Sequence, residues 1–252
     1  MDDQLSGSDV GAARAFARQR NPLLRRARRL TRPAWLGTLR RTGPLSDHWG
    51  NDRGTPIDRH YIEQFLTGQA SDIRGRVLEI KDTNYTTRYG HDVERSDVLD
   101  INPANPRATI IADLADATTV ADEQFDCFIL TQTLQLIYDL RSAIAHAHRL
   151  LRPGGVLLVT VPTVSRILRG DDARSDYWRF TPASCERLFA EAFGAEQVTL
   201  HRYGNVLTEI AFLTGLAREE LRPRELEMSD PSFPLLIGIR AVKRAGHDQD
   251  GQ

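Results

Sequence analysis

Short apolar runs alternate with amphipathic stretches from residue 76 onward, and this alternation predicts strands separated by helices. Strands are expected at residues 76–80, 97–101, 108–112, 125–130 and 156–161, with two more at 197–202 and 235–242. Helices are expected at 140–151 and 181–193. Strands that alternate with helices of this length form βαβ units, so the pattern predicts a doubly wound α/β fold with a mainly parallel sheet.

A further amphipathic helix is predicted ahead of the first strand, at residues 55–66. Thr55 is expected to be its N-cap, Pro56 suits the first helical position, and Asp58 places an acid near the helix N-terminus. Apolar residues recur at helical spacing behind them: Ile57, Tyr61, Ile62, Phe65 and Leu66. This segment therefore predicts a helix that packs on the sheet.

The charge along the chain divides it into a basic arm and an acidic body. Residues 1–45 hold ten Arg and three Asp, a net charge of +7, so the remainder carries −8 to give the formal total of −1. We expect an arm at 1–45, partly disordered, an α/β domain at 46–245 and a disordered tail at 246–252. In 21–42 Leu and Trp are interleaved with Arg. Surface helices on the body, contact with an anionic membrane or acidic partner, and nucleic-acid binding stay open for this arm.

Composition excludes several classes of site. Cys127 and Cys185 are too few for a disulfide framework or a Cys-rich metal site and are expected to be small buried residues. No cluster has metal-ligand spacing, so no metal is expected. No run approaches the roughly 18 apolar residues that span a bilayer, and the N-terminus lacks the apolar centre of a signal peptide. A cytoplasmic protein is expected, and its oligomeric state is not indicated.

Polar residues at the carboxyl ends of the predicted strands are candidate ligand-binding residues, because ligands of such sheets bind there. Glu79 ends the first strand, and Asp100 lies 21 residues further on at the end of the second. An acid at that distance is placed to accept hydrogen bonds from a ribose diol, although a helix cap or a turn would also use it. Asp113 follows the third strand, and Thr131 and Gln132 follow the fourth.

Residues 75–162 resemble the core of class I S-adenosylmethionine-dependent methyltransferases. The stretches that carry the resemblance are 77-VLEI, 97-DVLDI, 112-ADLAD, 125-FDCFILTQTLQLI and 149-RLLRPGGVLLVTVP. With the segments 48–66 and 176–189, which resemble acceptor-side parts of such enzymes, the likeness covers about three quarters of the chain. It implies a seven-stranded sheet whose last strands are antiparallel, and S-adenosylmethionine as the cofactor.

The resemblance also implies which residues contact the cofactor. They are Glu79, Lys81, Thr83, Tyr85, Asp100, Ile101, Asp113, Leu114, Thr131 and Gln132. Glu79 matches the acid of the family's glycine-rich turn, but Lys81 and Thr83 stand where glycines are usual. Residues 81–90 are expected to form a loop shaped by Thr, Asn and Asp instead. The ammonium of Lys81 should point away from the sulfonium or pair with the cofactor carboxylate.

An oxygen acceptor must lose its proton at or before methyl transfer, so a base is needed. The candidates are Asp58, His60 and His48 in the N-terminal segment, with Asp176 and Tyr177 after the fifth strand. Asp58 and His60 also have an ordinary structural explanation, as a helix-start acid and a surface residue. Arg53, Arg59 and Arg179 are placed to hold a phosphate or carboxylate of the acceptor, beside Trp178.

We therefore expect methyl transfer from S-adenosylmethionine to an oxygen, less readily a nitrogen, of a small molecule. A sugar or glycosylated metabolite is the favoured acceptor, on the resemblance of 48–66 alone. Two alternatives stay open: non-methylating chemistry on the same fold, motivated by the glycine-poor turn, and a non-catalytic partner protein. Nucleic acid is not an expected partner, because the body is acidic.

Overall fold

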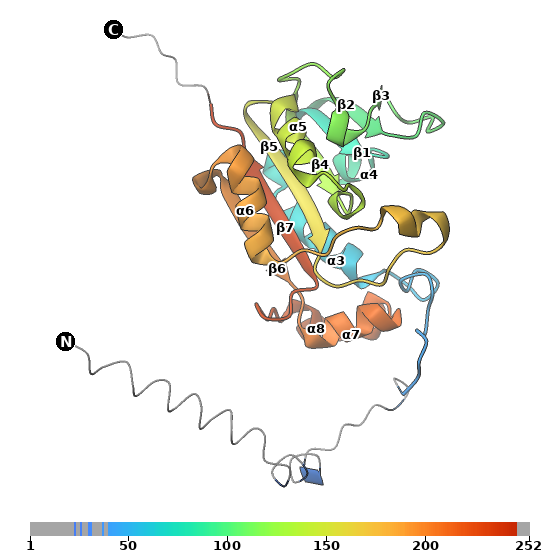
Figure 1. The fold of residues 1–252 in the computed structure, drawn as a ribbon. Helices are drawn as coiled ribbons and strands as arrows, with labels where there is room; N and C mark the ends of the chain where they lie inside the picture. The colour runs from blue at the N-terminus through green and yellow to red at the C-terminus, as the bar shows by residue number, and fades with distance from the viewer. Residues whose placement is uncertain (1–22, 24–25, 27–29, 32–36, 38–39, 246–252) are drawn as a thin grey trace, which may run out of the picture. The chain divides into compact units, whose positions relative to one another are not determined.

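The computed structural model describes residues 23, 26, 30, 31, 37 and 40–245 (Figure 1). The chain divides into two compact units, residues 1–43 and 44–252. Most of the predicted basic arm and the tail at 246–252 lie outside the described residues, so the expectations about them stay predictions. The sheet and the helices that pack on it belong to the second unit.

Seven strands form one sheet in the order β3-β2-β1-β4-β5-β7-β6. They are β1 (Gly75–Ile80), β2 (Val93–Asp100), β3 (Ile110–Ile111), β4 (Phe125–Thr131), β5 (Leu151–Pro162), β6 (Val198–Tyr203) and β7 (Leu236–Val242). Neighbours from β3 to β5 run parallel, whereas β7 is antiparallel to both β5 and β6. The expected mainly parallel, seven-stranded α/β fold is confirmed.

Helices cover both faces of this sheet. They are α3 (Ile57–Gly68), α4 (Asn84–Tyr89), α5 (Leu140–Leu150), α6 (Pro182–Phe193), α7 (Val206–Thr214) and α8 (Pro223–Glu227). Side chains of α5 and α6 share one core cluster with the sheet, and α3, α4, α7 and α8 contribute to the cluster on the other face. The layered arrangement leaves the carboxyl ends of the parallel strands free for a site.

The central strands are buried on both faces, so each carries an unbroken apolar run. In β4, Phe128 packs toward α5 and α6, whereas Cys127 and Ile129 pack toward α3. Cys127 and Cys185 are both fully buried, as expected. Helix α3 approaches β7 closely at Gly238, where an added Cβ would lie 2.5 Å from the ring of Phe65. That contact fixes α3, and with it Asp58, against the sheet.

The predicted start of α3 is wrong. Its N-cap is Pro56, and no side chain caps the helix. The Thr55 hydroxyl and N–H instead donate to the Glu219 carboxylate, at 2.7 and 2.9 Å. The Thr55 hydroxyl thus donates to a carboxylate distant in sequence and does not accept a hydrogen bond from the helix N-terminus.

Further boundaries differ from expectation, beginning with β2, which starts at Val93 rather than at residue 97. β5 begins at Leu151, not at residue 156, because Gly154 N–H donates to Lys243 O (2.8 Å) and keeps the Arg-Pro-Gly-Gly segment paired. β3 is only two residues long. Residues 84–89 form the helix α4 rather than a loop, so the turn after β1 is only three residues long.

Candidate functional site

A cleft of about 360 Å³ lies beyond the carboxyl ends of β1, β4 and β5. It is lined by Trp49, Asp58, Lys81, Gln132, Gln135, Leu136, Pro162, Val164, Ser165, Arg166, Leu168, Asp172, Ser175, Asp176, Arg179, Phe212 and Leu235. The lining combines apolar walls with amides and both signs of charge, as small-molecule sites do. Of the predicted cofactor contacts, Lys81 and Gln132 belong to this lining, and the other eight do not.

The turn after β1 is held by a buried carboxylate. Glu79 is 2% exposed and accepts hydrogen bonds from Tyr85 N–H (3.0 Å), Thr86 N–H (2.8 Å) and the Thr86 hydroxyl (2.7 Å). Desolvation raises the pKa of Glu79, and these hydrogen bonds oppose the rise. Lys81 has φ = 72°, the left-handed conformation for which glycine is the usual residue. Glu79 thus anchors the start of α4, and the backbone at Lys81 keeps a glycine-like shape.

The tip of β2 is tied to this turn through an asparagine. One Asp100 oxygen accepts from Asn102 N–H (2.9 Å), and the other accepts from Asn105 Nδ2 (2.6 Å). Asn105 Nδ2 also donates to Lys81 O (2.8 Å). A carboxylate offers about four acceptor positions, so Asp100 keeps room for a diol. The neighbouring Ile101 is 66% exposed and presents an apolar surface at the same tip.

The end of β3 supplies a weaker feature. Asp113 is exposed and accepts from Ala115 N–H at 2.9 Å, which caps a 3₁₀ turn at Leu114–Asp116. Leu114 is buried in the core beneath it. Asp113 is therefore anchored at one oxygen and accessible at the strand end.

Two amides after β4 meet in the cleft with unused hydrogen-bonding atoms. Gln135 Nε2 donates to Gln132 Oε1 at 3.2 Å. Gln132 Nε2 and Gln135 Oε1 are buried without a partner, and Gln132 has a left-handed φ of 46°. Buried polar atoms are seldom left unpaired, and exceptions cluster where ligands bind. Thr131 lies immediately before this pair, at the end of β4, and is partly buried.

Of the candidate bases, Asp58 and Asp176 line the cleft, and the Asp176 carboxylate is engaged in an ion pair with Arg179 at 2.6 Å. Burial raises the pKa of the Asp58 carboxyl, although Arg59 N–H donates to it at 2.8 Å. His60 lies outside the lining; desolvation, and then the charge of Arg218, lower its pKa. Tyr177 is 47% exposed and lies edge-on against Tyr138, also outside the lining.

The predicted acceptor-binding cations are separated by the fold. Arg53 forms an ion pair with Glu220, and Arg59 is exposed. Arg179 lines the cleft and pairs with Asp176 at 2.6 Å. Trp178 lies outside the lining, with its indole N–H donating to Ile137 O at 3.0 Å. Arg179 is thus the predicted cation that lies in the cleft.

Sequence reasoning missed Trp49, Gln135 and Arg166. The Arg166 guanidinium carbon lies 3.6 Å from the centroid of the Trp49 ring. Gln135 follows a strand end by only four residues, and Arg166 follows β5 by the same number. The positions of Gln135 and Arg166 shortly after strands could have been read from the sequence. The contact between Arg166 and Trp49 could not.

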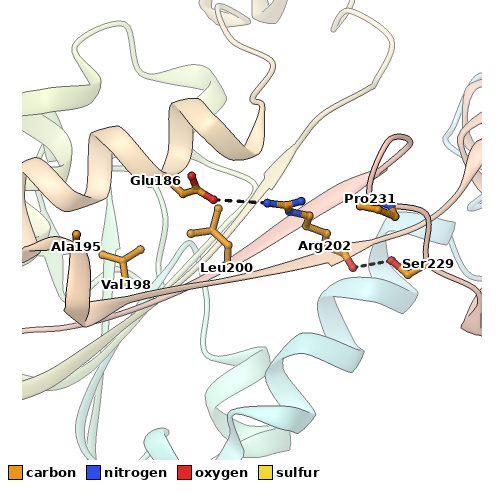
Figure 2. Close-up of a pocket in the computed structure, with 7 residues that line it drawn as sticks. All are labelled: Glu186, Ala195, Val198, Leu200, Arg202, Ser229 and Pro231. Carbon is orange, nitrogen blue, oxygen red and sulfur yellow. Dashed lines mark hydrogen bonds and ion pairs between the residues drawn. The ribbon is translucent and has the colours of Figure 1, made fainter. Parts of the chain in front are cut away.

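A second hollow lies at the far edge of the sheet, between α6, β6 and the segment before β7 (Figure 2). It is lined by Glu186, Ala195, Val198, Leu200, Arg202, Ser229 and Pro231. Arg202 forms an ion pair with Glu186 at 3.5 Å, and its carbonyl accepts from the Ser229 hydroxyl at 3.1 Å. None of the predicted site residues lines this hollow, so the cleft is the candidate site.

Within the described residues, no group of His, Cys, Asp or Glu is arranged to hold a metal ion. Likewise, no helix in the part of the chain that the structure describes is long and apolar enough to cross a membrane.

Comparison with known proteins agrees with this geometry. Residues 74–159 match the family model described as a methyltransferase domain. Among solved structures, the chain is similar to an S-adenosylmethionine-dependent methyltransferase from Archaeoglobus fulgidus, with 13% identity and a TM-score of 0.50 over 73% of this chain and 94% of that one. It is also similar to a putative sarcosine dimethylglycine methyltransferase from Galdieria sulphuraria, with 14% identity and a TM-score of 0.50 over 75% and 90%. The comparison with curated proteins gives no match. At these identities the structures show the fold, and the family model matches about a third of the chain.

Proposed function

We propose that this chain, a methyltransferase of the class I S-adenosylmethionine-dependent type, methylates a hydroxyl oxygen of a small molecule. The observation that carries the choice of oxygen is the desolvated carboxylate of Asp58 in the cleft, because a hydroxyl must lose its proton during transfer.

The residues at the strand ends fit the cofactor. The Lys81 ammonium and the unpaired Gln132 Nε2 are donors that suit a carboxylate. Asp100 has acceptor positions for the ribose, and Ile101 offers an apolar surface for the adenine. When bound, the cofactor supplies a methyl group already activated by its sulfonium. The remaining predicted residues are proposed as further contacts with the cofactor: Thr83, Asp113, Leu114 and Thr131.

Two other predicted cofactor contacts, Glu79 and Tyr85, take part in structural interactions within the protein. The Glu79 carboxylate is engaged by α4, so its contribution is to shape the turn. Tyr85 packs against the core on the α3 face, and burial raises its pKa to about 12. We propose that both act by fixing the backbone from which Lys81 projects.

In the proposed reaction, the Asp58 carboxylate accepts the proton of the acceptor hydroxyl. The acceptor oxygen would take the methyl group that the bound cofactor supplies by breaking its sulfur–methyl bond, which would leave S-adenosylhomocysteine. The raised pKa of Asp58 makes its carboxylate a stronger base than an exposed one. Gln135 Oε1, an unpaired buried acceptor, is available to a second hydroxyl. A polyhydroxylated acceptor, such as a sugar or a glycosylated metabolite, suits this arrangement.

The test is a methyl-transfer assay with labelled S-adenosylmethionine and a panel of monosaccharides, sugar acids and sugar phosphates. We expect Asp58→Asn to lower kcat by about 10²–10⁴-fold and to leave the affinity for S-adenosylhomocysteine, measured by calorimetry, unchanged. His60→Gln, outside the cleft, is the matched control and should retain activity. Full activity of Asp58→Asn would show that Asp58 is not the base.

The glycine-poor turn keeps the non-methylating alternative open, because Lys81 stands where a sulfonium cofactor usually meets glycine. The same assays separate the possibilities. Cofactor binding without methyl transfer to any acceptor class would favour other chemistry on this fold. No heat of binding with S-adenosylhomocysteine at high concentration would favour a non-catalytic partner.

A further inference from the structure

Unpaired hydrogen-bonding atoms concentrate in the cleft, and donors predominate among them. Within the described residues, the buried side-chain atoms without a partner include Gln132 Nε2, Gln135 Oε1, Arg166 Nε and Arg179 Nε, all from residues that line it. Three of these four atoms are donors. A ligand rich in acceptor oxygens would satisfy them, because an unpaired buried donor costs free energy.

The two guanidinium groups in the cleft differ in how their charge is balanced. Asp176 is 2% exposed and accepts from Arg179 Nη1 (2.6 Å), Arg179 Nη2 (3.0 Å) and Leu168 N–H (2.8 Å). The charge of Arg179 is therefore balanced by a carboxylate that is also bonded to its own loop.

Among the described residues, the groups that accept hydrogen bonds from the Arg166 guanidinium are neutral backbone carbonyls. It donates to Asp47 O (2.9 Å) and Ile167 O (3.3 Å). The Asp47 carboxylate is taken by Arg169 at 2.9 Å. Desolvation, and then the charge of Arg169, lower the pKa of Arg166, and the charge of Asp47 opposes them without restoring the usual value. A partly buried cation without a carboxylate partner favours the binding of an anion.

Arg166 is also held in a fixed orientation. Its guanidinium stacks on Trp49 at 3.6 Å, an arrangement that stabilises a cation on an aromatic face. Arg179 Nη2 donates to Arg166 O at 2.8 Å and fixes the backbone at this position. A guanidinium held in one plane presents paired donors to the two oxygens of an anionic group without further ordering.

We propose that Arg166, stacked on Trp49 and supported by Arg179, is a subsite for an anionic group of the acceptor, either a carboxylate or a phosphate. The inference rests on the proposed function, since it concerns the acceptor side of the same cleft. Asp58 and Asp172 also line the cleft and repel an anion. The acceptor therefore binds with its charged group at Arg166 and its reacting hydroxyl at Asp58.

The experiment measures binding rather than catalysis. Calorimetry at constant ionic strength compares D-glucose, D-glucuronate and D-glucose 6-phosphate as probes on protein saturated with S-adenosylhomocysteine. We expect at least one anionic probe to bind ten-fold or more tightly than glucose, and the stronger of the two identifies the carboxylate or the phosphate as the preferred group. Arg166→Gln should reduce this preference to less than two-fold.

Arg141→Gln is the matched control, because it removes the same charge from an exposed ion pair with Glu191, outside the cleft lining, and should keep the preference. Unchanged S-adenosylhomocysteine binding shows that each variant is folded. The proposal is overturned if the wild type shows no anionic preference, or if both variants lose it equally. Asp58→Asn should retain the preference, so a failure of the proposed base leaves this result interpretable.

Discussion

At the scale of single residues, Asp100 has both a structural and a proposed binding role. Its carboxylate orders residues 102–105 through Asn102 and Asn105, and Asn105 in turn reaches the carbonyl of Lys81. Removing the carboxylate would therefore disturb the loop as well as any contact with a ribose. The two effects can be separated because Asn105 takes part only in the first.

We expect Asp100→Ala to weaken S-adenosylhomocysteine binding by about 1–3 kcal/mol, the usual cost of losing a hydrogen bond to a charged group. Asn105→Ala removes the bridge to Lys81 but leaves the carboxylate, and should weaken binding by less than about 1 kcal/mol. Isothermal titration of both variants provides the measurement. Equal losses would mean that Asp100 acts only through the loop.

Single residues also show what the sequence could predict about the site. Strand ends are recognisable from apolar runs, and this was sufficient to select Gln132, whereas Lys81 was selected by the resemblance to the methyltransferase core; both line the cleft. The stack of Arg166 on Trp49 joins residues that are far apart in the sequence. Such a contact depends on tertiary packing, for which local spacing carries no information.

At the scale of elements, the turn between β1 and α4 shows how a glycine-poor sequence adopts a left-handed backbone at Lys81. The Glu79 carboxylate replaces missing local hydrogen bonds by binding the first N–H groups of α4. The left-handed conformation at Lys81 costs about 1–2 kcal/mol for a residue with a Cβ atom. The hydrogen bonds of the buried Glu79 carboxylate thus offset the backbone strain at Lys81.

Substitutions at Lys81 test this balance. Lys81→Gly should raise the free energy of unfolding by about 0.5–1 kcal/mol, because relief of strain exceeds the entropy that glycine adds to the unfolded chain. Lys81→Ala keeps the Cβ atom and should not stabilise the fold. Both variants lose the ammonium, so both should bind S-adenosylhomocysteine more weakly. Urea unfolding and calorimetry measure the two effects, and equal stability of the Gly and Ala variants would contradict the strain argument.

Element boundaries were predicted wrongly from the sequence where distant segments decide them. Pro153 and two glycines predict a break after α5, yet pairing between Gly154 and Lys243 near the end of β7 extends β5 back to Leu151. Residues 84–89 lack a strong helical pattern, and α4 forms because Glu79 binds its N-terminus. The long apolar strands were recognised because a strand buried on both faces is apolar at consecutive residues.

At the scale of the whole molecule, three half-buried histidines link folding to pH. His60 is in α3, His148 is in α5 edge-on to Phe193, and His201 is in β6 beside Phe65. Desolvation is the main cause that lowers the pKa of each, with smaller contributions from Arg218, Lys243 and Arg240 respectively. Burial thus disfavours the charged imidazolium at three separate places in the fold.

The sign of the effect is set by proton binding. A histidine whose folded pKa lies below the unfolded value of 6.5 binds fewer protons in the folded state. Stability therefore rises with pH wherever the unfolded chain binds more protons, and is lost as the pH falls through 6.5 toward the folded values. Asp58 and Glu79 have raised pKa values and act in the opposite direction, above 3.8 and 4.5.

We therefore expect the urea concentration at the midpoint of unfolding to decrease as the pH is lowered from 7.5 to 5.5. A variant with His60→Gln, His148→Gln and His201→Gln should show a flatter dependence over this window, because glutamine does not titrate. The same measurement on Asp58→Asn shows how far the Asp58 carboxyl reduces the dependence of the wild-type midpoint on pH. If the triple variant keeps the full pH dependence of the wild type, groups other than these histidines govern stability near neutrality.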